Sequence, residues 1–185
     1  MCIRMVRFWR STCDVLTSDL TGSPSINCFF VPVHSAGLYF FSWPFWLEGV
    51  KHGVIAVPAG QGATSFVDAR DIAASAVAAL TSNAFDGKAY DLTGPQALSY
   101  AEAAAILGEV AGKPIRYKAS TDTAFIAMLT GAGVPADYAA FLAMIFHPVR
   151  EGWTARVTGD VEKLSGRRPT GLVDYARDHR AALNG

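Results

Sequence analysis

The sequence predicts a protein of the α/β class, because short β-type runs alternate with segments of helical periodicity from residue 48 onward. Its 185 residues are enough for one domain with a sizeable core. Hydrophobic residues make up 51% of the chain and charged residues 17%, which excludes a disordered chain. We expect a mainly parallel sheet that gives way to helices near the C-terminus.

Three short strands and one helix are expected in the first part of this region. Val54–Val57 is a β-type run that ends at a proline, and residues 59–62 form a turn before a second strand at 64–67. Residues 89–92 form a third strand, which ends at a Thr-Gly-Pro turn. Between these strands Asp71 is expected to cap a helix. Its inward face repeats at helical spacing: Ile72, Ala76, Ala79 and Leu80.

The next helix has the clearest start signal in the sequence. Ser99 and Glu102 have the spacing of a capping box, in which each side chain binds a backbone amide near the helix start. The helix should end at Gly112. Its apolar face consists of Ala103, Ile106, Leu107 and Val110.

A strand at 114–118 and four helices should complete the chain. The first helix opens at Ser120, and the second follows Pro135 after a glycine break at 131–133. Asp160 and Thr170 are expected to cap the two last helices. The expected inward side chains are Phe125, Met128 and Leu129, then Tyr138, Phe141, Leu142 and Ile145, then Leu172, Tyr175, Ala176 and Leu183.

Residues 1–47 differ in composition from the rest of the chain. Residues 1–50 contain one alanine and residues 51–185 contain twenty-nine, and no residue from 20 to 47 carries a formal charge. Three interpretations remain open: a membrane segment, the buried core of a domain whose other half is missing, or translation from a wrong start or shifted frame. Prolines and polar residues interrupt the uncharged run before it reaches the ~20 residues of a spanning helix, so we favour the latter two.

The charge balance, the cysteines and the histidines indicate which partners, compartment and metal to expect. Sixteen basic residues balance sixteen acidic ones, without the basic excess typical of nucleic-acid binders, so no nucleic-acid partner is expected. The cysteines, Cys2, Cys13 and Cys28, fit neither a disulfide framework nor a zinc site, and indicate a reducing, cytoplasmic compartment. The four histidines form no metal-binding pattern, so no metal is expected.

No cofactor-binding residue can be assigned from a motif. Neither G-x-G-x-x-G nor the phosphate-loop motif occurs, and no tyrosine has a lysine four residues later. Asp68 and Asp71 flank Arg70, which we interpret as an ion pair plus a helix cap. We interpret Tyr175 and His179, on one helix face, as packing. The catalytic residues therefore stay unknown.

Several segments resemble the NmrA-like family of atypical short-chain dehydrogenases/reductases. The segments are Ser-Phe-Val-Asp-Ala-Arg-Asp-Ile-Ala (65–73), Gly-Lys-Ala-Tyr-Asp-Leu-Thr-Gly-Pro (87–95), Leu-Ser-Tyr-Ala-Glu (98–102), Pro-Ile-Arg-Tyr (114–117) and Thr-Gly-Asp-Val-Glu-Lys-Leu-Ser-Gly-Arg-Arg-Pro (158–169). The resemblance covers about residues 48–183 in consistent order. It implies the C-terminal part of a Rossmann-like NAD(P)-binding fold, with a helix-rich module on the substrate side.

The resemblance also implies an activity. Intact members reduce small acceptors such as quinones or azo compounds with NAD(P)H, or act as redox regulators. Because the glycine-rich loop is missing here, we expect an incomplete reductase that binds NAD(P) poorly and is inactive alone. The alternative is a non-catalytic binding or regulatory protein. We expect Phe146, His147 and Trp153 to form a substrate wall, because aromatic side chains suit a flat acceptor.

Overall fold

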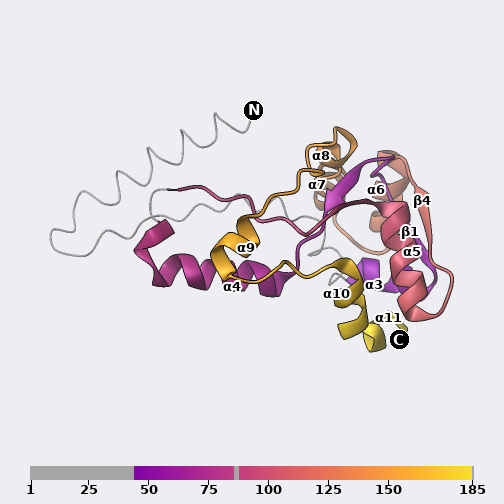
Figure 1. The fold of residues 1–185 in the computed structure, drawn as a ribbon. Coiled ribbons are helices and arrows are strands. Elements are labelled where there is room, and N and C mark those ends of the chain that lie inside the picture. Colours follow the sequence, from indigo (N-terminus) through magenta and orange to yellow (C-terminus); the bar gives the residue numbers. More distant parts are fainter. Residues whose placement is uncertain (1–43, 86–87, 185) are drawn as a thin grey trace.

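The computed structural model describes residues 44–85 and 88–184. The three cysteines and nearly all of the atypical segment 1–47 therefore lie outside the described residues. Figure 1 shows the elements in order along the chain. They are α3 (Pro44–Lys51), β1 (Val54–Val57), β2 (Ala63–Ser65), α4 (Ala69–Thr81), the 3-10 turn η1 (Asn83–Phe85), β3 (Ala97–Ser99), α5 (Tyr100–Ala111), β4 (Arg116–Ala119), α6 (Asp122–Gly131), α7 (Ala136–Met144), α8 (His147–Arg150), α9 (Asp160–Ser165), α10 (Leu172–Asp178) and α11 (Arg180–Asn184).

The α/β class is confirmed, with two small sheets in the described part of the chain. β1 pairs with β4 in parallel, in the register Val54↔Arg116 to Val57↔Ala119. β2 pairs with β3 antiparallel, in the register Ala63↔Ser99 to Ser65↔Ala97. The expected mainly parallel sheet is thus correct for one pair and wrong for the other. A short antiparallel pair needs only two segments that run in opposite directions, which β2 and β3 supply across α4.

Two apolar clusters hold these elements. The larger one joins β1, β3 and α5 to α6, α7, α10 and α11, with Ile55, Tyr100 and Leu107 at most 2% exposed. The smaller one packs α4 and α9 around Val67, Tyr90 and Leu92. In Figure 1 the larger group lies on the right, while α4 and α9 lie on the left.

The helix starts show where local signals are reliable. The capping box of α5 is confirmed: Glu102 N donates to Ser99 Oγ, and Ser99 N donates to Glu102 Oε2 at 2.8 Å. Gly112 then ends α5 in the left-handed region, with φ 74°. In α6 the expected cap at Ser120 is wrong by one residue, because Thr121 Oγ1 accepts the Ala124 amide instead.

Three other expected caps are also displaced. α4 is capped by Asp68, whose extended backbone lets its carboxylate accept the Arg70 amide at 2.8 Å. Asp71 lies one turn inside α4, and its carboxylate accepts the Thr170 amide at 2.6 Å. At α9 and α10 the cap positions are glycines, because Asp160 is already helical and Thr170 binds Asp71.

Several side chains expected to face inward are exposed. Leu80 of α4 is 75% exposed, Met128 of α6 is 47% and Phe141 of α7 is 50%. In α7 the buried face is formed by Ala139, Leu142 and Ala143 instead. Small alanine side chains let α6 and α7 approach closely, which turns the stacked rings of Tyr138 and Phe141 outward.

The strand expected at residues 89–92 is not formed. The segment is extended, but no other described strand lies beside it. The Asp91 amide donates to Asp160 Oδ2 at 2.9 Å rather than to a strand carbonyl. A β-type sequence needs a ladder partner as well as a favourable composition, and here the partner is a side chain.

None of the described helices is both long and apolar enough to cross a membrane.

Candidate functional site

The candidate site is built on the segment that follows α8. Gly152, with φ 74°, turns the chain out of α8 and into an extended run along the edge of β2. The Ser65 amide donates to Thr154 O at 2.9 Å, and Thr154 Oγ1 donates to Ala63 O at 2.8 Å. The buried hydroxyls of Thr64 and Thr154 lie 3.2 Å apart. These bonds hold the edge of β2 beside a segment that lies about ninety positions later in the sequence.

The same segment continues past Asp91 and Thr93. The Thr158 amide donates to Thr93 Oγ1 at 2.9 Å, and the Thr158 hydroxyl donates to the Asp91 carbonyl. Arg156 Nη1 lies 2.5 Å from Asp91 Oδ2 and forms an ion pair with it. Residues 91–93 and residues 153–158 are therefore held side by side.

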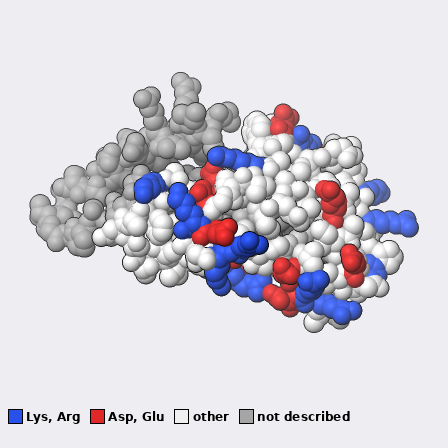
Figure 2. Space-filling model, in the orientation of Figure 1, with Lys and Arg blue, Asp and Glu red and all other residues white. Residues whose placement is uncertain are grey.

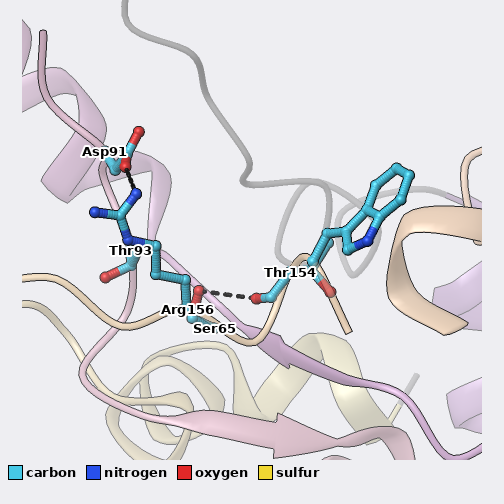
Figure 3. A pocket seen from close by; sticks show the side chains of 6 residues that line it. Ser65, Asp91, Thr93, Thr154 and Arg156 are labelled. Carbon is cyan, nitrogen blue, oxygen red and sulfur yellow. Dashed lines mark hydrogen bonds and ion pairs between the residues drawn. The ribbon is translucent and has the colours of Figure 1, made fainter. Parts of the chain in front are cut away.

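A small surface pocket of about 120 Å³ opens between these segments (Figure 3). Its lining combines three hydroxyl side chains, one ion pair and one aromatic ring. The lining residues are Ser65, Asp91, Thr93, Trp153, Thr154 and Arg156. Sequence reasoning found Trp153 but missed the others, because they come from three distant segments and share no spacing.

The structure brings two of the three expected substrate-wall residues together. The rings of His147 and Trp153 meet edge to face, with 5.6 Å between centroids. Trp153 is 59% exposed and lines the pocket. Phe146 lies deeper: it is 1% exposed, and its ring packs against those of Tyr100 and Phe125. Their role in substrate binding stays a prediction.

The turn after β1 packs against α8 and is held by several hydrogen bonds. Arg150 Nη1 donates to Pro58 O at 2.5 Å, and its guanidinium also pairs with Asp122 at 3.0 Å. The Tyr117 hydroxyl donates to Gly60 O at 2.9 Å. Gly62 packs so closely that an added Cβ would lie 2.1 Å from Val149 O. This turn is a rigid support for the segment that carries Trp153.

The phenols beside this turn are not poised to give up a proton. Burial raises the pKa of Tyr100 well above its usual value, although the Thr64 hydroxyl partly opposes the shift. Burial also raises the pKa of Tyr117. Both hydroxyls therefore stay protonated at neutral pH and act here as hydrogen-bonding groups of the fold.

The other polar residues singled out from the sequence have structural partners. Asp68 caps α4 and also binds the Arg70 guanidinium, with Arg70 Nη2 2.6 Å from Asp68 Oδ2. Tyr175 and His179 stack with 4.2 Å between ring centroids, in agreement with a packing role. Within residues 44–85 and 88–184, no group of three His, Cys, Asp or Glu side chains is placed to hold a metal ion.

The described residues do not fit the pyrophosphate of a dinucleotide. That group needs a glycine-rich turn leading from a strand into a helix N-terminus. Here Gly60 and Gly62 lead from β1 into β2, and the start of α4 already holds the Asp68 carboxylate. On the face shown in Figure 2, acidic and basic side chains of the described residues are interspersed.

The sequence is similar to several reductases. It is 41% identical over 133 residues to an NAD(P)H azoreductase of Xenophilus azovorans, which is 72% of this chain and 46% of that protein. It is 38% identical over 129 residues to an uncharacterized oxidoreductase of Bacillus subtilis, 70% of this chain and 45% of that one. The chain thus spans about half the length of the curated relatives it matches. It matches no family model.

The solved structures of similar fold also include NADP(H)-dependent reductases. The triphenylmethane reductase of Citrobacter, solved with NADP(H), has a TM-score of 0.69 and 27% identity, over 77% of this chain and 50% of that one. An NADPH-dependent quinone oxidoreductase from Escherichia coli has a TM-score of 0.67 at 27% identity, over 72% and 50%. The chain therefore resembles the NmrA-like group of NAD(P)-binding reductases, over the C-terminal portion of that fold.

Proposed function

We propose that this chain supplies the acceptor side of an NAD(P)H-dependent reductase that acts on small, electron-poor aromatic acceptors of the quinone or azo type. The observation that carries the proposal is the 41% identity to an NAD(P)H azoreductase over 72% of the chain. Two solved reductases of similar fold are named for triphenylmethane and quinone compounds, which contain six-membered carbon rings.

The pocket beside Trp153 has the chemistry that such an acceptor needs. The exposed indole offers a flat apolar face, and the edge of the His147 ring fixes its position. Ser65, Thr93 and Thr154 place hydroxyls within the same pocket, where they can meet a carbonyl or azo group. Phe146 supports this wall from the core rather than through direct contact.

We further propose that the chain does not turn over acceptor by itself. The given sequence contains no glycine-rich dinucleotide loop, and the start of α4 is capped by the Asp68 carboxylate, which would repel a phosphate. The alternative function is that of a non-catalytic binding or redox-regulatory protein of the same family, which does not need the glycine-rich loop. In either case we propose a cytoplasmic location, based on an odd number of cysteines without the spacing of a disulfide framework or a zinc site.

Isothermal titration of the chain with a soluble naphthoquinone tests the acceptor site. Trp153→Ala should weaken binding about 10-fold, because it removes the stacking face. Met144→Ala is the matched control, since it also removes an exposed apolar side chain but lies outside the pocket lining. An equal effect of both substitutions, or no heat of binding, would contradict the proposal.

A second assay separates the two functions. The chain is mixed with NADPH and the naphthoquinone, and NADPH consumption is followed by its absorbance. We expect none. Saturable NADPH binding without quinone binding would favour the regulatory protein, whereas NADPH consumption would contradict inactivity of the chain alone.

A further inference from the structure

The hydroxyl groups that line the candidate pocket already have hydrogen-bond partners. Ser65 Oγ donates to Thr154 O at 3.2 Å, and Thr154 Oγ1 donates to Ala63 O at 2.8 Å. Thr93 Oγ1 lies 3.3 Å from both the carbonyl oxygen and the hydroxyl oxygen of Thr158. The protons of these three hydroxyls therefore have acceptors within the fold, and a ligand meets the hydroxyls mainly as acceptor oxygens.

Arg156 is the charged lining residue that still has N–H groups to donate. Its Nη1 atom lies 2.5 Å from Asp91 Oδ2, and within residues 44–85 and 88–184 neither its Nε nor its Nη2 atom has a hydrogen-bond partner. The Arg156 side chain is 73% exposed. In Figure 3 a dashed line joins one terminal nitrogen of Arg156 to Asp91, and the other terminal nitrogen points away from Asp91. The guanidinium edge formed by Nε and Nη2 is thus open to a ligand.

Asp91 fixes the position of this guanidinium. The Asp91 amide donates to Asp160 Oδ2 at 2.9 Å, and its carbonyl accepts from the Thr158 hydroxyl, so the backbone is held on both sides. The Asp91 side chain is 28% exposed, and its carboxylate binds Arg156 through Nη1 alone. Since Arg156 lines the pocket, this ion pair leaves the Nε–Nη2 edge for a ligand that lies there.

A free guanidinium edge favours a particular kind of ligand. Its two parallel N–H groups match two neighbouring oxygen atoms, and they bind more strongly where those oxygens carry negative charge. The exposed ring of Trp153 lines the same pocket and suits a flat ring. A flat aromatic compound with an ionised oxygen beside a carbonyl oxygen meets both requirements.

We propose that Arg156 selects, among flat aromatic acceptors, those that carry an ionised oxygen next to a carbonyl, as in the anion of a hydroxyquinone. Asp91 acts as a positioning residue for Arg156. The inference rests on the proposed function, because it names the kind of acceptor that the same pocket takes. The charges of Asp91 and Arg156 offset each other, so we expect a preference of a few-fold rather than exclusion of neutral quinones.

Two naphthoquinones of similar size test the proposal. 2-Hydroxy-1,4-naphthoquinone is an anion at neutral pH, whereas 2-methoxy-1,4-naphthoquinone is uncharged. Isothermal titration of the full chain gives a Kd for each compound, and the ratio of the two Kd values measures the preference. The parent chain should bind the 2-hydroxy compound about 5-fold more tightly, and Arg156→Gln should abolish that preference.

Matched variants separate the guanidinium edge from charge alone. Arg168→Gln removes the same charge from an exposed arginine outside the pocket lining and should keep the preference at about 5-fold. Arg156→Lys keeps the charge without the parallel N–H groups and should retain a preference of about 2-fold. Trp153→Ala should weaken both compounds alike, because it removes the ring face and not the cation. Circular dichroism melting checks that each variant is folded.

The outcomes distinguish this inference from the acceptor site itself. A preference that Arg156→Gln abolishes and Arg168→Gln keeps would support it. Equal binding of both compounds by the parent chain, an equal loss in Arg168→Gln, or the full preference in Arg156→Lys would overturn it. In those cases the acceptor site still stands if Trp153→Ala weakens both compounds. Failure of both compounds to bind would contradict the acceptor site and this inference together.

Discussion

Arg70 binds the carboxylate of Asp68 through its Nε and Nη2 atoms, and Nη2 lies 2.6 Å from Asp68 Oδ2. Its Nη1 atom lies 2.7 Å from Asp178 Oδ2 in α10. One guanidinium thus joins the cap of α4 to the C-terminal helices, across 108 positions of sequence. Asp68 is 2% exposed, so its charge depends on these partners.

The first prediction concerns acid stability. Burial favours the neutral form of Asp68, but hydrogen bonds from the Arg70 side chain and amide, with the charges of Arg70 and His179, outweigh it and lower the pKa. A lowered folded-state pKa contributes stability above the unfolded value, which is lost as pH falls through the folded value. Arg70→Ala should therefore cost about 1 kcal/mol of unfolding free energy near neutral pH, and less as the pH falls through the folded-state pKa of Asp68.

Urea unfolding at several pH values checks this. Arg177→Ala is the control, because that guanidinium pairs with Asp174 on the exposed surface and should change the unfolding free energy little at any pH. A difference between Arg70→Ala and the parent chain that stays constant from neutral to acid pH would show that the Asp68 charge is not involved.

The second prediction concerns the start of α6. Thr121→Ala removes the hydroxyl that accepts the Ala124 amide and should cost about 1 kcal/mol. Ser120→Ala should cost nothing or stabilise slightly, because its buried hydroxyl has no hydrogen-bond partner among the described residues. Thermal melting of the two variants checks the order. The reverse order would place the cap at Ser120.

The third prediction concerns two glycines with opposite surroundings. A Cβ on Gly94 would lie 1.7 Å from Phe66 O, so Gly94→Ala should destabilise the chain by about 3 kcal/mol or more. A Cβ on Gly131, the last residue of α6, would meet nothing within 4 Å. Gly131→Ala should stabilise by up to about 1 kcal/mol. Chemical denaturation measures both; similar effects would refute the packing around Gly94.

The capping box of Ser99 and Glu102 is found where expected, since a cap needs only residues within one turn. The strand Val54–Val57 is also found where expected, because the distant β4 supplies its ladder partner. The strand at 89–92 is not found, because strand formation depends on a partner that its own sequence does not specify.

The lining of the candidate pocket cannot be predicted from the sequence, for a related reason. Trp153 could be singled out as a large aromatic residue, but Ser65, Thr93 and Thr154 look like ordinary polar residues. Their role depends on hydrogen bonds between segments far apart in the chain. Sequence patterns with a period of two or about four residues carry no information on such contacts.

The bonds from Thr154 to Ala63 and Ser65 also affect the order of folding. They close a loop of about 90 residues, so β2 cannot complete this edge until Thr154 has been synthesised. At ~5–20 residues per second on the ribosome, that interval is roughly 5 to 20 s. During this interval the β2 edge of the β2–β3 pair lacks the hydrogen bonds that Thr154 supplies. This is the period in which the nascent chain should be most prone to aggregation and most dependent on chaperones.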